Sequence, residues 1–140
     1  MLRISWSLCF LFLTLTTQAA IWSREPTDGD LEHTKDSLET VKQRIEKQEA
    51  ILVDVRELVE WDAGHVQSAV FLPWRSLQDK FDEDELRKKL PDDKIIYTYC
   101  AVGYRALRAG KIIAKYGYDV RPLKPGYEEL VKVGFKSEKN

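Results

Sequence analysis

Short apolar runs alternate with amphipathic segments along this chain, and that alternation restricts the fold to a few architectures. Residues 51–55 and 95–99 form runs rich in apolar side chains, with the length of strands that are buried on both faces of a parallel sheet. Between and after these runs, apolar residues recur every three or four positions, which is typical of amphipathic helices. Strands that alternate with helices predict an α/β domain with a mostly parallel central sheet and helices on both of its faces.

The remaining elements follow from the same periodicity and from the positions of Gly and Pro. We expect helices from about Asp36 to Lys47 and over residues 57–63, 82–90, 106–116 and 127–133, and strands over residues 51–55, 69–72, 95–99 and 118–123. Asp36 and Glu39 are expected to form the capping pair of the first helix. With 140 residues, 44% of them hydrophobic, the chain has material for one core, and we assign a single domain to residues 36–136.

Residues 1–20 have the pattern of a cleavable signal peptide. Arg3 is their one charge, an unbroken apolar run follows, and small residues end the segment at Ala19 and Ala20. We expect cleavage after one of these alanines, then a polar, flexible leader over residues 21–35, and export of the domain to the periplasm or out of the cell. An uncleaved membrane anchor is the alternative, although the apolar run is short for a spanning helix.

Cysteine content and charge narrow the functional classes. Loss of the signal peptide would remove Cys9 and leave Cys100 as the sole thiol in an oxidising compartment, which indicates either pairing with another protein or a reactive thiol. The net charge of -1 gives no basic excess for nucleic acid. No group of Cys and His has the spacing of a metal site in the sequence, and we expect neither a metal nor an organic cofactor.

Cys100 opens a loop between the second buried strand and the next helix. Ligands of α/β sheets bind beyond the carboxyl ends of strands, where this loop is expected. Inward-pointing backbone N–H groups and the helix N-terminus would favour an anion there and would stabilise a thiolate. Gly103 gives the loop its backbone freedom, Arg105 adds a positive charge, and Tyr104 is placed at the mouth of the site.

The order and spacing of five sequence segments indicate a protein family. They read DVRE at 54–57, EWDAGHV at 60–66, AVFLP at 69–73, CAVGYR at 100–105 and LKPGYEELVKVGF at 123–135. In these segments the chain resembles the rhodanese (thiosulfate sulfurtransferase) family in its single-domain form, over roughly residues 37–135. The resemblance implies the rhodanese fold and a persulfide on Cys100. It also implies an anion-binding loop made by Ala101, Val102, Gly103, Tyr104 and Arg105.

The same resemblance implies a two-step sulfurtransferase. A donor such as thiosulfate or a persulfide would load Cys100, and cyanide or a thiol, including that of a thioredoxin-like protein, would accept the sulfur. Asp54, Arg56 and His65 match family positions that we interpret as mainly structural, and His33 in the leader is given no role.

Some residues depart from the family pattern. Ala101 and Val102 lack the basic side chains that some thiosulfate-using members carry, Gln67 and Ser68 replace a Pro-Gly pair, and Pro125 replaces the first of two glycines. These departures leave the identity of the sulfur donor open.

Two other functions are weighed against sulfur transfer. Related cysteine phosphatases and arsenate reductases place five residues between Cys and Arg, whereas Cys100 and Arg105 are separated by four, which favours a single sulfur atom over a tetrahedral oxyanion. A non-catalytic sulfur carrier or interaction module is the alternative from a different class.

Overall fold

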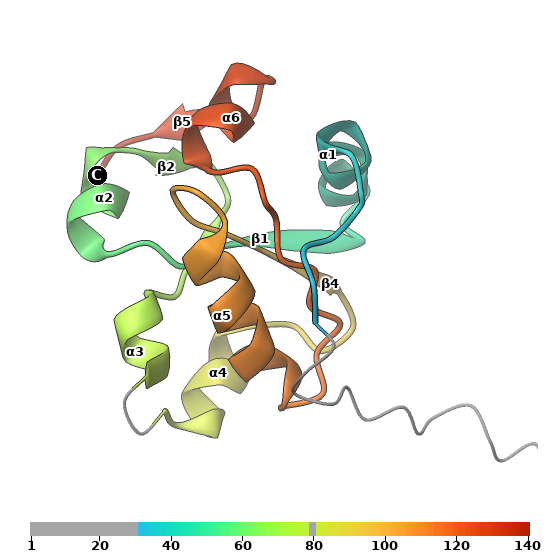
Figure 1. The fold of residues 1–140 in the computed structure, drawn as a ribbon, viewed down its shortest axis with the longest axis vertical. Coiled ribbons are helices and arrows are strands. Elements are labelled where there is room, and N and C mark those ends of the chain that lie inside the picture. Colours follow the sequence, from blue (N-terminus) through green and yellow to red (C-terminus); the bar gives the residue numbers. More distant parts are fainter. Residues whose placement is uncertain (1–30, 79–80) are drawn as a thin grey trace, which may run out of the picture.

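The computed structural model describes residues 31–78 and 81–140, and its centre is a parallel sheet with the strand order β3-β1-β4 (Figure 1). The helices are α1 (Leu38–Glu46), α2 (Leu58–Ala63), α3 (Trp74–Gln78), α4 (Glu83–Lys89), α5 (Tyr104–Ala114) and α6 (Tyr127–Lys132). The strands are β1 (Ala50–Asp54), β2 (His65–Val66), β3 (Val70–Phe71), β4 (Ile95–Tyr99) and β5 (Ser137–Glu138). The expected signal peptide and residues 21–30 of the expected leader lie outside the described residues.

The register of the sheet brings the carboxyl ends of its strands together. β1 pairs with β4 from Ala50 opposite Ile95 to Asp54 opposite Tyr99, and β1 pairs with β3 on its other side, where Asp54 lies opposite Phe71. Because all of these pairs are parallel, the loops that follow β1, β3 and β4 begin at the same edge of the sheet.

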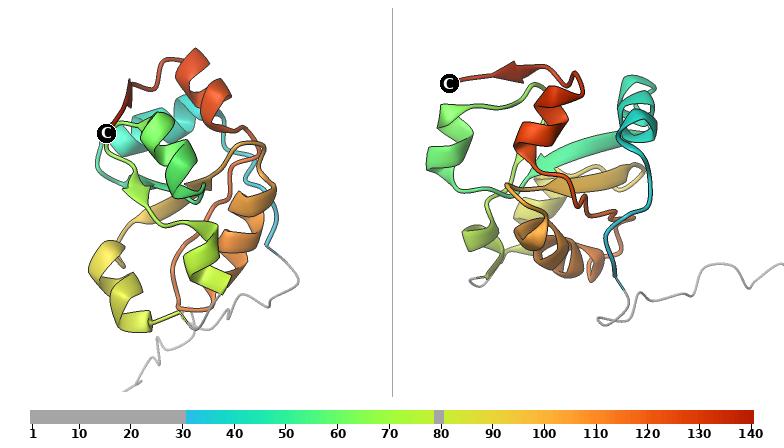
Figure 2. Two further views of the ribbon diagram at one scale, coloured as in Figure 1. Left: turned by 90° about the vertical axis from the view of Figure 1, so that its left-hand side faces the viewer. Right: turned by 45° about the horizontal axis from the view of Figure 1, so that its top comes forward.

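Successive side chains of the central strands enter two different cores. Leu52 of β1 and Tyr97 of β4 pack with α1 and α6, whereas Val53 and Ile96 pack with α3, α4 and α5. Figure 2 shows these two groups of helices on opposite sides of the sheet. The predicted α/β class, parallel sheet and covering helices are therefore confirmed. Among the described residues, no helix is long and apolar enough to cross a membrane.

Residues 118–123, which we expected to form a strand, run alongside β4 but make only one isolated bridge to it, between Ile96 and Val120. Arg121 and Leu123 donate backbone hydrogen bonds to β4, of 2.8 and 2.9 Å. Pro122 between them has no N–H group to donate. A full strand was therefore the wrong prediction for this edge, although the segment does extend the sheet.

Three short elements of the fold were not predicted from the sequence. Helix α3 directly follows Pro73, which we had interpreted only as the end of a strand; proline also suits the start of a helix because it has no N–H to satisfy there. Strands β2 and β5 are two residues each and pair antiparallel, His65 opposite Glu138 and Val66 opposite Ser137. Such a pair has no periodicity that a sequence could display.

Residues 31–35, which we call the N-terminal strap, contact the domain although we had expected them in the leader. The side chain of Leu31 packs against the core beneath α5, and the Thr34 amide donates to the Pro122 carbonyl at 2.8 Å. Helix α1 is capped by Ser37, whose hydroxyl accepts from the Thr40 amide at 3.1 Å, and Asp36 is not the cap we expected.

Asp36 instead joins the chain entering α1 to the sheet. Its Oδ2 accepts hydrogen bonds from the Tyr97 hydroxyl at 2.6 Å and from the guanidinium groups of Arg44 and Arg121. The Tyr97 hydrogen bond above all, followed by those two cations, lowers the pKa of Asp36 to about 2 against an opposing rise from burial. The ionised carboxylate therefore stabilises the fold.

We expect Asp36→Asn to lower the free energy of unfolding at pH 7 by about 1 kcal/mol, a modest value because solvent reaches this cluster. A depressed folded-state pKa gives stability that is present above the unfolded value and is lost as the carboxylate protonates. The deficit of the variant should therefore shrink as the pH falls from about 4 to about 2, in urea unfolding at several pH values. Asp93→Asn, at an exposed turn, is the control; a deficit that stays constant to pH 2 would contradict the assignment.

Candidate active site

Cys100 is the first residue after β4 and is fully buried. Backbone hydrogen bonds hold this position on two sides. The Val55 amide donates at 3.0 Å to the carbonyl of Tyr99, the residue before Cys100, and the Tyr127 amide at the start of α6 donates at 2.9 Å to the carbonyl of Cys100 itself. The thiol is thus fixed at the edge of the sheet where the loops converge.

The loop after Cys100 directs a backbone amide at the sulfur. The N–H of Gly103 donates to Sγ of Cys100 at a distance of 3.1 Å, and Gly103 is also the N-cap of α5. The thiol therefore lies at the amino end of an 11-residue helix, where the partial positive charge favours negatively charged groups.

Glycine is required at position 103 for two reasons. Its φ of +85° lies in the left-handed region, and a Cβ there would meet the Lys124 carbonyl oxygen at 2.6 Å. Gly126 is required only because its backbone lies against the Cys100 loop: a Cβ added at this position would lie 1.7 Å from the Ala101 carbonyl oxygen. The second residue of the Pro125-Gly126 pair therefore lets the start of α6 close on the loop.

The N-terminal strap also contacts this loop. Nε2 of His33 donates to the carbonyl oxygen of Gly103 at 3.0 Å. The same oxygen accepts the first helical hydrogen bond of α5, from Leu107 at 3.1 Å. His33, to which the sequence analysis gave no role, thus helps to hold the loop.

Arg105 lies in the first turn of α5 and forms a two-pronged ion pair with Glu60 of α2. Its two terminal nitrogens are 2.6 and 2.8 Å from the Glu60 carboxylate oxygens. The Arg105 hydrogen bonds lower the pKa of Glu60, and Glu60 is the main cause of the raised pKa of Arg105, to which Cys100 adds in the same direction. The charge of Arg105 is thus already neutralised by a carboxylate from another helix.

Three other loop residues that we expected at the site face solvent. Ala101, Val102 and Tyr104 are exposed, and the Tyr104 hydroxyl accepts a hydrogen bond from Arg108 at 2.7 Å. The Arg108 guanidinium also lies over the Trp74 ring of α3, 5.5 Å from its centroid. The loop therefore presents an apolar and aromatic rim around the buried thiol.

Asp54 and Arg56 are buried beneath the site and do not face it. Arg56 donates to both carboxylate oxygens of Asp54 and, at 2.7 Å, to the Gly64 carbonyl. Its guanidinium also lies 4.2 Å from the centroid of the Tyr127 ring. The pair ties the end of β1 to the turn before β2 and to α6.

His65 contributes to the same support. Its ring stacks on Trp61 at a centroid distance of 3.5 Å, its Nδ1 donates to the Trp61 carbonyl, and its Nε2 lies 3.3 Å from Glu138 of β5. These contacts hold α2 and the C-terminal segment together, away from the Cys100 sulfur.

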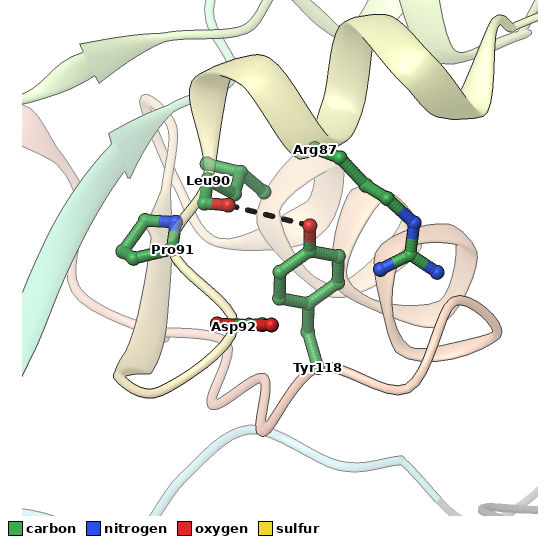
Figure 3. Close-up of a pocket in the computed structure, with 5 residues that line it drawn as sticks. All are labelled: Arg87, Leu90, Pro91, Asp92 and Tyr118. Carbon is green, nitrogen blue, oxygen red and sulfur yellow. Dashed lines mark hydrogen bonds between the residues drawn. The ribbon is translucent and has the colours of Figure 1, made fainter.

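A separate cavity of about 170 Å³ lies between the end of α4 and Tyr118, whose hydroxyl donates to the Leu90 carbonyl (Figure 3). It is lined by Arg87, Leu90, Pro91, Asp92 and Tyr118. Residues 90–92 precede β4, so the cavity lies at the end of that strand opposite Cys100. It takes no part in the candidate active site.

Glu60 is the site residue that the sequence analysis overlooked. It belongs to the EWDAGHV segment and was assigned no role, because its partner Arg105 is 45 positions away. In the sequence, Glu57, Glu60 and Asp62 are equally candidates for a partner of Arg105, and nothing in their spacing distinguishes Glu60.

Comparisons with known proteins agree with this geometry. The rhodanese-like domain family matches residues 37–132. Thiosulfate:glutathione sulfurtransferase of Saccharomyces cerevisiae is 35% identical over 99 residues, which are 64% of this chain and 71% of the yeast protein. The probable adenylyltransferase/sulfurtransferase MoeZ of Mycobacterium tuberculosis is 37% identical over 68 residues, 49% of this chain but 16% of that larger protein.

A solved structure gives the same result for the fold. The BH2092 protein of Bacillus halodurans superimposes with a TM-score of 0.61 at 28% identity, over 73% of this chain and 74% of that chain. The chain therefore belongs to the rhodanese-like domain family, and its sulfurtransferase relatives support sulfur transfer as its general class of chemistry.

Proposed function

We propose that this protein is a thiosulfate sulfurtransferase that carries a sulfane sulfur on Cys100 as a persulfide. The observation that carries the proposal is the amide of Gly103, which donates to the Cys100 sulfur at the N-terminus of α5. This arrangement supports a thiolate that can attack a sulfur donor, and it places fixed donors where negative charge moves during transfer.

In the first step the Cys100 thiolate attacks the outer sulfur of thiosulfate. A sulfur–sulfur bond forms at Cys100, the bond to the sulfonate sulfur breaks, and sulfite departs with that electron pair. In the second step cyanide or a thiolate attacks the outer sulfur of the persulfide, and Cys100 leaves as a thiolate. Both steps are displacements at sulfur and need no metal, redox cofactor or added oxidant.

The spacing of the loop supports this chemistry over phosphatase or arsenate reductase activity. Four residues separate Cys100 from Arg105, and the loop closes directly into α5 at Gly103. Arg105 is bound to Glu60 through both terminal nitrogens, so the positive charge of the loop is already partly compensated.

We expect intact-mass analysis to show one added sulfur atom after thiosulfate treatment, and its loss on adding cyanide. Cys100→Ser should abolish both, because it removes the nucleophile, whereas Cys9→Ser should leave both unchanged. Thiosulfate:cyanide turnover should also exceed hydrolysis of an aryl phosphate and reduction of arsenate in parallel assays. Normal sulfur uptake by Cys100→Ser would refute the persulfide, and efficient aryl phosphate hydrolysis would indicate the phosphatase function instead.

We expect Arg105→Ala to lower kcat/KM for thiosulfate by about tenfold or more, since it removes the cation of the loop and leaves the Glu60 carboxylate unpaired beside it. Arg105→Lys should recover only part, because a point charge cannot reproduce the guanidinium fork. Glu60→Gln should act in the opposite direction and lower KM for thiosulfate, because it releases the charge of Arg105.

Melting temperatures of these variants are the control for loop structure. If Glu60→Gln damages thiosulfate kinetics as much as Arg105→Ala does, the ion pair is a clamp between α2 and α5 and Arg105 is not an anion site.

We also propose that the protein is exported and then loses residues 1–20. The support is the pattern of these residues in the sequence: one early charge, an apolar run and a small-residue exit at Ala19 and Ala20. N-terminal sequencing of the exported protein should therefore begin at Ala20 or Ile21. Intact Met1 recovered from a membrane fraction would support the anchor instead.

A further inference from the structure

Exposed apolar side chains are concentrated beside Cys100. Among residues 31–78 and 81–140, the large hydrophobic side chains that are mostly exposed are Leu58 (57%), Val59 (76%), Val102 (79%), Tyr104 (63%) and Val133 (50%). All but Val133 belong to the Cys100 loop, the start of α5 or the start of α2. We call Leu58, Val59, Val102 and Tyr104 the apolar collar.

The Glu60–Arg105 ion pair brings the two parts of the apolar collar together. Leu58 and Val59 immediately precede Glu60 on α2, while Val102 and Tyr104 precede Arg105 at the start of α5. The ion pair therefore links the two parts of the apolar collar at the edge of the sheet where the Cys100 thiol is buried. Exposed apolar groups gathered at one site on a protein surface indicate contact with a partner.

The charges near the apolar collar define the chemistry of that partner further. The guanidinium of Arg105 is already neutralised by Glu60. On the α5 side, the exposed cations that border the loop are Arg108, bound to the Tyr104 hydroxyl, and Lys124, whose backbone abuts Gly103. On the α2 side, the acidic residues Glu57 and Asp62 flank Leu58 and Val59, so the carboxylates of a partner fit only the α5 side. A complementary surface is apolar at its centre, carries carboxylates at its edge and projects a thiol that reaches the buried sulfur.

We propose that the apolar collar docks the acceptor, a protein whose reactive cysteine is flanked by apolar side chains with acidic residues at the edge. This inference rests on the proposed function. The acceptor thiolate attacks the outer sulfur of the Cys100 persulfide, the bond between the two sulfurs of that persulfide breaks, and Cys100 departs as a thiolate. The sulfane sulfur is then a persulfide on the acceptor cysteine, and the step involves no net oxidation or reduction.

The test uses two peptide acceptors of equal length and charge, N-acetylated and C-amidated. One has Leu and Val beside its cysteine and the other has Ser and Gly there; both carry an acidic residue at each end. Persulfide-loaded protein is mixed with each peptide, with glutathione and with cyanide, and transfer is followed by mass. The variants are Leu58→Ser and Val59→Ser in the apolar collar, with Val133→Ser as the matched control outside it.

The wild type should transfer sulfur to the apolar peptide about tenfold faster than to the polar one, and Leu58→Ser or Val59→Ser should each reduce that preference about three- to fivefold. Val133→Ser should keep the preference. Transfer to cyanide should be unchanged in all three variants, because cyanide has no apolar surface to dock, and melting temperatures should match.

Equal rates with the two peptides, or a faster reaction with glutathione than with the apolar peptide, would overturn the docking proposal while leaving the persulfide mechanism intact. An equal loss of preference in Val133→Ser would also overturn it. Failure to load Cys100 or to discharge it to cyanide would overturn the proposed function, and the docking proposal with it.

Discussion

The parallel pairing of β1 with β4 is the constraint on which the site depends. Because the two strands run in the same direction with Asp54 opposite Tyr99, the residues that follow them start from one edge of the sheet. The first segment supplies Arg56 and Glu60 and the second supplies Cys100 and Arg105, although the two are separated by about half of the domain. An antiparallel pair would have placed these groups at opposite ends of the molecule.

The base of the site is held by a buried ion pair, and the cation of its loop is paired with a carboxylate. Arg56 is buried with hydrogen bonds to Asp54 and to the Gly64 carbonyl, so the turn that precedes β2 and the start of α6 are fixed beneath the loop. Above this base, Glu60 neutralises Arg105, and the exposed side chains of the loop and of the start of α2 include Leu58, Val59, Val102 and Tyr104. The contacts at the sulfur thus come from the Gly103 amide and the start of α5, whereas the exposed apolar side chains lie outside this buried part of the site.

The sequence was sufficient for features with a local pattern. The bounds of β1 and β4 agree with the prediction to within one residue because their short runs consist mostly of apolar and β-branched residues. Cys100 and Gly103 could be placed because a predicted strand and a predicted helix lie on either side of them. Helix α3 and the β2–β5 pair were missed because each is too short to show a period. Contacts between distant segments, such as Glu60 with Arg105 or His33 with Gly103, leave no trace in spacing and needed the three-dimensional structure.

The contact of His33 with Gly103 bears on where this domain begins. The family match covers residues 37–132, which omits both His33 and β5. A protein trimmed to those limits would retain Cys100 and its loop but lose the imidazole that holds the Gly103 carbonyl and the strand that pairs with His65 and Val66. The contacts that hold the domain together therefore extend beyond its boundary of family resemblance, and the N-terminal strap packs directly against the Cys100 loop.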